Sequence, residues 1–309
     1  MAKKNKILTQ IEYAATRISL GAMSLLPRSA AIRAGMLIMR AVSVLSGNLR
    51  RTGMRNLEIA FPEKTVEQRA AILRGTFDSL GRLLGELSHI PKLTGDSLAE
   101  MIDLDPDGNL EAAYRKVKAE GRGVLVTTAH LGNWELFVLS FAARFEPISY
   151  LARPLDNPKI DSLLNRLRER FGNTPINKTH SFNKAIRVLR HGGILGVLAD
   201  VNAHPKEGVF VPFFGVPACT PSGAAMLAMR SNALIYPMFC VWDSTASRYK
   251  VVHGSALEPS NTGDRKQDII NTTARYTSEI EKLVRAYPDQ WMWIHRRWKT
   301  RPPGEDPIY

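Results

Sequence analysis

The stretch of this sequence best suited to chemistry is HLGNWE, at residues 130–135. Histidine takes up a proton near neutral pH, and a general base of this kind contributes about 10²- to 10⁴-fold to a rate. Such a base needs an acceptor on its other ring nitrogen, so that the correct tautomer faces the substrate. We therefore expect His130 and Glu135 to form a catalytic pair, with Glu135 curling back to hold the imidazole. No GxSxG sequence accompanies them, so a substrate hydroxyl is the expected nucleophile.

The residues around this stretch predict a turn between a buried strand and a helix. Residues 123–128 form an apolar run of strand length, and a helical pattern follows Asn133. Gly132 permits a tight turn, Asn133 is a typical N-cap, and their backbone N–H groups are expected to bind an oxyanion or a phosphate. Ligands of open α/β sheets bind at such strand ends. Spacing alone also allows a structural role, in which His130 satisfies the turn and Glu135 complements the helix dipole.

Strand and helix patterns alternate along the rest of the chain. Helical spacing covers residues 66–90, 110–120, 157–171, 181–191 and 264–286, and strand-length apolar runs cover 123–128, 148–152, 194–199, 233–241 and 249–253. Prolines break a longer uncharged run, 208–229, which predicts a strand, a loop and the start of a helix. The alternation indicates βαβ units. The predicted fold class is α/β, with a mostly parallel central sheet flanked by helices.

Three more polar residues are candidates for binding substrate. Arg153 closes the run 148–152, where a guanidinium can hold a phosphate through two hydrogen bonds. Asp200 follows the strand pattern 194–199 and should reach the same edge of the sheet, to orient Arg153 or a sugar hydroxyl, although a turn or cap role is also open. Arg296 lies in a C-terminal segment rich in tryptophan and arginine, which suits an anionic substrate. At least Trp291 or Trp293 of that segment is expected in the core.

The charge of the chain favours an anionic partner. Its 309 residues include 42 Lys and Arg against 29 Asp and Glu, a formal net charge of +13. Nucleic acid, lipid headgroups or an acidic protein would each complement this surplus. Nucleic acid is the weakest of the three because the sequence has no recognisable reading motif. With two cysteines outside any CxxC spacing and no HExxH pair, neither a disulfide framework nor a metal site is expected.

The first fifty residues predict helices that lie in a membrane interface. Four arginines between residues 17 and 40 interrupt an apolar tract, and its longest uncharged run, 18–27, is about half of the roughly 20 residues that cross a bilayer. Arginines among leucine, isoleucine and methionine are typical of interfacial helices. A helical layer with an ordinary solvated basic face is the alternative. We therefore predict a membrane-associating layer at 1–50 and an α/β domain at 51–309.

HLGNWE resembles the HxxxxE motif of the lysophospholipid acyltransferase-like superfamily, and specifically that of the bacterial lipid A secondary acyltransferases, the lauroyl and myristoyl transferases. Further segments agree in order: NLEIAFP at 56–62, RPLDNP at 153–158, GVFVPFFG at 208–215 and WIHRRWK at 293–299. The likeness runs from about residue 12 to about residue 303. One departure is Asp200-Val201-Asn202, where the family often carries Asp-Gln, so any role of that glutamine side chain is absent here.

The resemblance implies a membrane-associated O-acyltransferase at the cytoplasmic face of the bacterial inner membrane, peripheral or monotopic. A fatty acyl chain would pass from acyl carrier protein, or less favourably from acyl-CoA, to a hydroxyl of a lipid A precursor, without a metal or another cofactor. His130 and Glu135 would be catalytic. The residues expected to bind substrate are Arg153, Asp200, Asn133, Gly132 and Arg296.

Other functions remain open from the sequence. The acceptor could be a different glycolipid, such as a phosphatidylinositol mannoside, or an aminolipid, because the motifs report acyl transfer more directly than the acceptor. A peripheral lipid-binding protein without catalysis is an alternative of a different class. The expected partners are acyl carrier protein, an anionic glycolipid and a membrane surface, and not nucleic acid.

Overall fold

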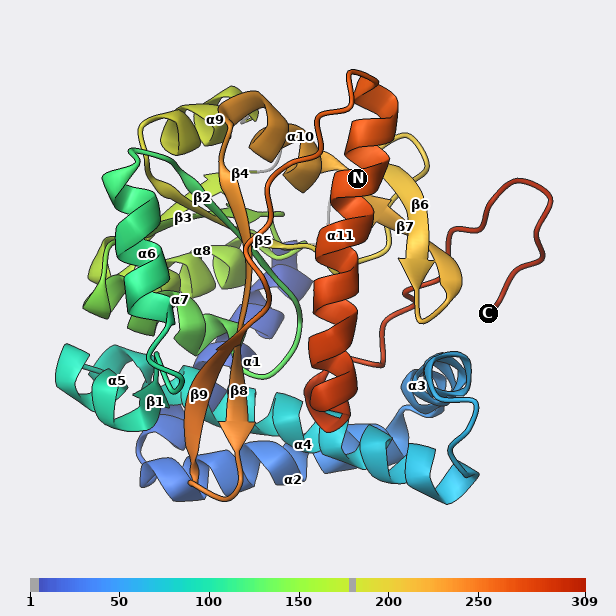
Figure 1. The fold of residues 1–309 in the computed structure, drawn as a ribbon. Coiled ribbons are helices and arrows are strands. Elements are labelled where there is room, and N and C mark those ends of the chain that lie inside the picture. The colour runs from blue at the N-terminus through green and yellow to red at the C-terminus, as the bar shows by residue number, and fades with distance from the viewer. Residues whose placement is uncertain (1–5, 178–181) are drawn as a thin grey trace.

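A seven-stranded sheet in the order β1-β9-β8-β2-β5-β3-β4 runs through the centre of the protein (Figure 1). The computed structural model describes residues 6–177 and 182–309. The strands are β1 (Ile102–Asp103), β2 (Val124–Thr128), β3 (Ile148–Ala152), β4 (Thr174–Asn177), β5 (Ile194–Leu198), β6 (Gly208–Phe213), β7 (Val216–Pro221), β8 (Leu234–Asp243) and β9 (Arg248–His253). Strands β8, β2, β5, β3 and β4 are parallel, and β9 runs antiparallel to β8. The predicted α/β fold with a mostly parallel central sheet is confirmed.

Helices cover both faces of this sheet. They are α1 (Lys6–Ser24), α2 (Arg28–Leu45), α3 (Gly47–Ala60), α4 (Val66–His89), α5 (Gly95–Met101), α6 (Leu110–Ala119), α7 (Trp134–Arg144), α8 (Pro158–Arg168), α9 (Phe182–Arg190), α10 (Gly223–Ser231) and α11 (Arg265–Ala286), with short 3₁₀ turns at Ile90–Lys92, Arg170–Gly172 and Pro288–Gln290. The helix predicted from Ser181 is described from Phe182 onward, and Ser181 itself lies outside the described residues.

Two hydrophobic cores form because side chains alternate along each strand. Leu125 of β2 belongs to the core that includes α9, α10 and α11. Its neighbours Val124 and Val126 belong to the other core, with α5, α6, α7 and α8. All five residues of β2 are buried, as expected for a central parallel strand covered on both faces. The strand before the HLGNWE turn is therefore held from both sides.

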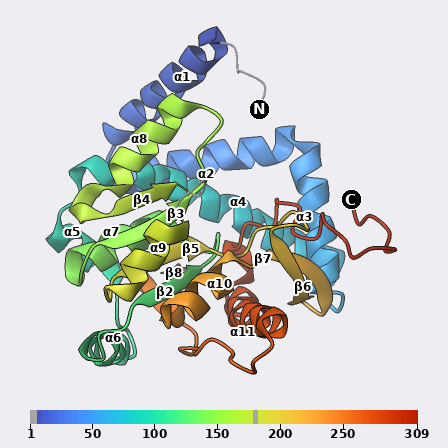
Figure 2. The ribbon, with the colours of Figure 1, turned by 90° about the horizontal axis from the view of Figure 1, so that it is seen from above.

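The first four helices form a layer at the edge of the sheet where the parallel strands end. Figure 1 shows α4 and α2 crossing below the carboxyl end of β8, and Figure 2 shows α1 beside α8. Helices α2 and α4 pack closely through Gly35, Gly81 and Gly85, where an added Cβ would collide with the backbone of the facing helix. The expected boundary between residues 50 and 51 falls inside α3.

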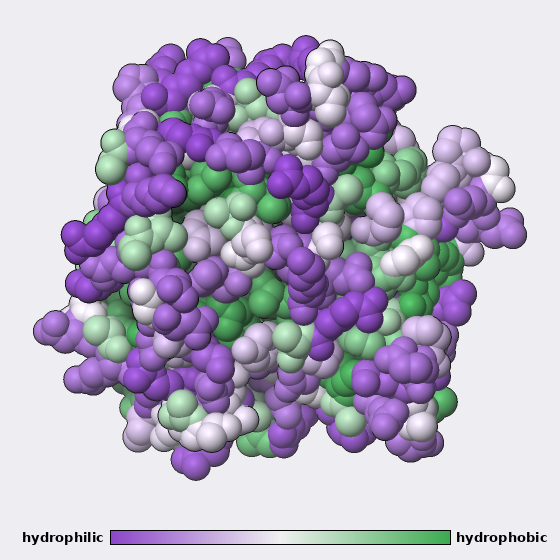
Figure 3. Space-filling model, in the orientation of Figure 1, coloured by the Kyte–Doolittle hydropathy of each residue, from purple (hydrophilic) through white to green (hydrophobic). Residues whose placement is uncertain are grey.

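No single described helix is long and apolar enough to cross a bilayer, although α2 and α3, which meet at a bend of 91°, pass the same test as a pair. The face of the protein crossed by α11 and β9 is mostly hydrophilic, with apolar atoms visible between the polar side chains (Figure 3). Among the described residues, the exposed large apolar side chains fall mainly in one segment: Ile7, Leu8, Ile11, Ile18, Leu25, Leu26, Leu37, Ile38, Val44 and Leu45.

The structure differs from the sequence prediction after β5. Residues 208–229 were expected to form a strand, a loop and a helix start, but β6 and β7 make an antiparallel hairpin before α10. Phe214 and Gly215 connect them, both with positive φ, as in the tight two-residue turns whose twist matches paired strands. The phenylalanine explains why the sequence did not predict this turn, because positive φ is uncommon outside glycine and asparagine.

Candidate active site

His130 and Asp200 follow neighbouring parallel strands. In the register of β2 and β5, Thr128 is paired with Leu198, and each polar residue comes two positions later. The ends of parallel strands lie at one edge of a sheet, so the two side chains emerge together. The prediction that Asp200 reaches the edge that carries His130 is confirmed.

The carboxylate of Asp200 holds the imidazole of His130. Its Oδ1 lies 2.9 Å from Nδ1 of His130, and its Oδ2 accepts from the backbone N of His130 at 2.8 Å and from Nε1 of Trp291 at 2.9 Å. A carboxylate that accepts several hydrogen bonds is oriented firmly. Because Asp200 accepts at Nδ1, the proton of the neutral ring lies there, and Nε2 carries the lone pair.

Burial and charge shift the pKa values of His130 and Asp200 in opposite directions. Burial disfavours the imidazolium of His130, but the charge and hydrogen bond of Asp200 outweigh it, so the pKa of His130 is raised. Burial likewise disfavours the Asp200 carboxylate, yet His130 and its backbone N–H lower the pKa of Asp200 below its ordinary value. The side chain of Asp200 is fully buried, whereas that of His130 is 18% exposed. The site thus has an ionised, inaccessible carboxylate behind a partly accessible imidazole.

Glu135 faces Arg168 and not His130, which corrects the expected geometry. Its two oxygens accept from Nη2 and Nε of Arg168 at 2.5 and 2.7 Å, and Trp134 Nε1 adds a third bond at 3.1 Å. The ring of His130 already has Asp200 as its acceptor, and Glu135 is drawn to the guanidinium of α8 by a two-point charge-assisted contact. Glu135 influences His130 through its negative charge, which favours the imidazolium.

Arg168 is a residue of this site that the sequence interpretation missed. It is the last residue of α8, and burial, which lowers its pKa, is outweighed by the hydrogen bond and charge of Glu135, so that the pKa of Arg168 is raised. Its positive charge also reaches His130, whose imidazolium it disfavours. The helix at 157–171 was predicted, but no local motif marks which of its arginines faces the sheet. Only the packing of α8 against α7 makes the choice.

The turn between β2 and α7 is held by the backbone. Gly132 has a φ of +64°, and a Cβ there would collide with the carbonyl of Cys240. The N–H of Gly132 donates to Gln290 O at 3.0 Å, and that of Asn133 donates to Cys240 O at 2.7 Å. Both amides are therefore engaged, which corrects the expectation that they bind an oxyanion or phosphate. Asn133 is the N-cap of α7, as predicted, since its side chain accepts from Leu136 N.

Arg153 and Arg296 both lie exposed. Arg153 follows β3, which pairs in parallel with β5, so it lies at the same edge of the sheet as Asp200. Arg296 packs over the ring of Tyr309, with 5.8 Å from its Cζ to the ring centroid. Their roles toward a substrate stay predictions.

The tryptophans of the C-terminal segment are core residues, which confirms the prediction for Trp291 and Trp293 and extends it to Trp298. Trp291, Trp293 and Trp298 are each fully buried. Arg297 is also buried, and its guanidinium donates to backbone oxygens and to Thr220 Oγ1 at 2.6 Å. Burial lowers the pKa of Arg297 to about 10. Of the two neighbouring arginines, only Arg296 is left on the surface.

The chain resembles known proteins over most of its length. Residues 1–300 match the family described as bacterial lipid A biosynthesis acyltransferase. A lipid A biosynthesis lauroyltransferase of Escherichia coli K12 is 30% identical over 254 residues, which cover 81% of this chain and 79% of that protein. A palmitoleoyltransferase of lipid A biosynthesis from the same strain is 28% identical, with 82% and 80% covered. A myristoyltransferase of lipid A biosynthesis, also from that strain, is 23% identical, with 84% and 78% covered.

The match to the family covers nearly the whole chain, so it includes both His130 and Asp200. The α/β fold, the turn that carries His130 and the carboxylate of Asp200 lie within the matched residues. The chain therefore belongs to the bacterial lipid A biosynthesis acyltransferase family, whose chemistry is acyl transfer.

Proposed function

We propose that the chain transfers a fatty acyl group from the thioester of acyl carrier protein to a hydroxyl of a lipid A precursor. The observation that carries this proposal is the contact between His130 and Asp200 at the carboxyl edge of the parallel sheet. It supplies an oriented base, and acyl transfer to a hydroxyl needs one. The names of the relatives support the lipid A precursor as acceptor.

In the proposed reaction, Nε2 of His130 takes the proton of the acceptor hydroxyl as its oxygen attacks the thioester carbon. A tetrahedral intermediate forms, the C–S bond then breaks, and the thiolate recovers the proton from the imidazolium. Asp200 keeps the ring in the required tautomer and stabilises the imidazolium during the step. Atoms and charge balance without a metal or another cofactor, because the products are an ester and a thiol.

In this proposal two arginines stabilise negative charge, one in the transition state and one on the substrate. Arg168 is positioned by Glu135 and adds positive charge near His130, where negative charge develops on the thioester oxygen in the transition state. Arg153, at the same edge, is exposed and suited to a phosphate of the acceptor. In this assignment Glu135 orients Arg168, and Asp200 takes the orienting role that the sequence predicted for Glu135.

We further propose that α1 and α2 rest on the membrane, at the cytoplasmic face of the inner membrane. Leu25, between the two helices, and Leu45, at the end of α2, are each 85% exposed. Arg17 of α1 and Arg33 of α2 are also exposed, and such arginines suit lipid phosphates. Helices α2 and α4 cross below the edge where the parallel strands end (Figure 1). A lipid acceptor would therefore be presented close to His130.

The decisive experiment uses purified wild type and His130→Ala with labelled acyl carrier protein thioesters and a phosphorylated tetra-acyl lipid A precursor. Product from wild type alone would support donor, acceptor and base together. Transfer by His130→Ala at the wild-type rate would overturn the base assignment. Thioester loss that depends on His130 but yields no acylated precursor would rule out this acceptor. The same assay with acyl-CoA in place of the carrier protein thioester tests the donor.

A further inference from the structure

An ion pair with a buried carboxylate joins α2 to α4 within the N-terminal helical layer. Arg28, the first residue of α2, donates to the Glu86 carboxylate through Nε at 2.9 Å and Nη2 at 2.6 Å. The Glu86 side chain is 1% exposed, and that of Arg28 is 34% exposed. Replacing both members of such a pair by apolar groups is often neutral for stability. A contribution to stability therefore does not by itself explain why the buried side chain of residue 86 is a carboxylate.

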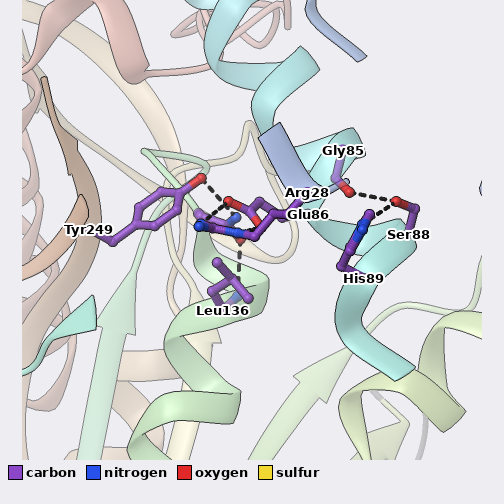
Figure 4. Close-up of polar contacts among 8 residues, drawn as sticks. Arg28, Gly85, Glu86, Ser88, His89, Leu136 and Tyr249 are labelled. Atoms are coloured by element: carbon purple, nitrogen blue, oxygen red, sulfur yellow. Dashed lines mark hydrogen bonds and ion pairs between the residues drawn. The ribbon is translucent and has the colours of Figure 1, made fainter. Parts of the chain in front are cut away.

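The junction between α1 and α2 is held by the same end of α4. The ring Nε2 of His89 donates to the carbonyl of Leu26 at 3.1 Å, and Lys92 donates to the carbonyl of Ser24. Figure 4 shows His89 and Ser88 on α4, one turn beyond Glu86. The start of α2 thus has a fixed position relative to α4.

Tyr249 links this pair to the interior of the sheet. It belongs to β9, and its hydroxyl points toward Glu86 and Arg28 (Figure 4). Burial, followed by the negative charge of Glu86, raises the pKa of Tyr249 well above its ordinary value, so the phenol stays protonated. The side chain of Asn133 donates through Nδ2 to the Tyr249 oxygen at 3.3 Å. Tyr249 therefore lies between the ion pair and the turn that carries His130.

The amide of Asn133 needs one orientation. Its Oδ1 accepts from the backbone N of Leu136 at 3.0 Å and so caps α7. A rotated amide would present its NH₂ group to that N–H and lose the cap. Because Nδ2 must then face Tyr249, the phenol selects the orientation that keeps the cap. The cap in turn sets the start of α7, which carries Glu135.

We propose that Arg28, Glu86 and Tyr249 are positioning residues that tie the N-terminal helical layer to the catalytic turn. The inference rests on the proposed function, with His130 as the base. Contact of the layer with lipid would then hold α2 against α4, keep the Arg28–Glu86 pair closed and maintain the Asn133 turn in the geometry that catalysis uses. The N-terminal layer is in this view part of the catalytic apparatus and not only an anchor.

The test is a steady-state comparison of variants in vesicles that contain the acceptor lipid. Tyr249→Phe removes one hydroxyl and keeps the ring, so kcat should fall about 3- to 10-fold. Glu86→Gln keeps the shape of the side chain and removes its charge, so kcat should fall about 10-fold or more. The KM of donor and acceptor should stay within about twofold of wild type, because positioning acts in the transition state.

The matched control lies on the same two helices. Arg40 and Asp78 also form a two-point pair between α2 and α4, at 2.6 and 2.8 Å. Asp78 precedes Glu86 by eight residues, or about 12 Å along the helix. Asp78→Asn should leave kcat unchanged. An equal loss of kcat in Asp78→Asn and Glu86→Gln would mean that both pairs merely hold the helices together, and it would overturn the proposal.

Wild-type kcat in Tyr249→Phe and Glu86→Gln would overturn it as well. If Glu86→Gln does not fold, the double variant Arg28→Met with Glu86→Leu removes both charges and takes its place. His130→Ala in the same vesicles tests the proposed function separately. If the acceptor proves wrong, the His130-dependent rate of thioester loss supplies the kcat for the comparison, so failure of the inference can be told from failure of the proposed acceptor.

Discussion

Nδ1 of His130 lies 2.9 Å from Oδ1 of Asp200, although 70 residues separate them in the chain. The parallel pairing of Thr128 with Leu198 brings them together, and the backbone N–H of His130 and Nε1 of Trp291 hold the other carboxylate oxygen. The contact has a direct chemical consequence. It leaves Nε2 of His130 as the ring nitrogen that carries the lone pair.

Removing the charge of Asp200 should change both the rate and its pH dependence. In Asp200→Asn the favoured tautomer is lost, so kcat should fall about 10²- to 10⁴-fold. In wild type, Asp200 raises the pKa of His130, so if His130 is the base, activity should fall as acid protonates the imidazole below that raised pKa. Without the carboxylate, burial lowers the pKa of His130, and the acidic limb should move to lower pH. A pH–rate profile with an unmoved limb would contradict the assigned contact.

Glu135→Gln should separate the roles of the two carboxylates. The substitution weakens the two-point contact with Arg168 and should lower kcat about 10-fold or more, since a partly buried guanidinium without its carboxylate loses its orientation. The acidic limb should shift less than in Asp200→Asn, because Glu135 acts on His130 by charge alone. Arg168→Lys is the matched control and should show a similar loss, because lysine lacks the two-point geometry. If Glu135→Gln shifts the limb as far as Asp200→Asn, Glu135 is the orienting group.

Arg153→Ala should weaken binding of the acceptor more than catalysis. An exposed guanidinium that holds a phosphate contributes about 1.5 to 3 kcal/mol, so the acceptor KM should rise about 10- to 100-fold with the donor KM unchanged. Arg296→Ala, also exposed, tests the second predicted contact in the same way. For an acceptor without phosphates, neither substitution should change the acceptor KM. An unchanged acceptor KM in either variant removes that arginine from the binding site.

Serine at Leu25 and Leu45 should weaken binding to vesicles. Both side chains are 85% exposed, so their loss costs little stability, and each should lower the free energy of membrane binding by about 1 to 2 kcal/mol. Val66→Ser is the control, because Val66 is 58% exposed but is the first residue of α4, outside the segment 6–45 that α1, α2 and their junction form. Co-sedimentation with anionic vesicles measures the effect. Equal binding by all three variants and wild type would place the membrane contact elsewhere.

Part of the site could be predicted from the sequence because it is local. Gly132 and Asn133 have the residue types that a tight turn and an N-cap require, and the structure has the turn and the cap where they were expected. Strands β2, β3, β5, β8 and β9 were predicted from apolar runs of strand length, and most helices from the period of 3.6, which reports only which face of a helix is buried. That information was enough to place His130, Arg153 and Asp200 at strand ends.

The partners of these residues were decided by the tertiary structure. Local spacing made Glu135 the natural acceptor for His130, but the order of the strands, which sequence patterns do not contain, put β5 beside β2 and Asp200 against the ring. Helix α8 then brought Arg168 to Glu135. By itself the sequence determined most of the elements, the turn and the place of His130 within it, since short-range geometry governs these. The pairing of charges across 33 and 70 residues depended on long-range packing, which arises only when the sheet assembles.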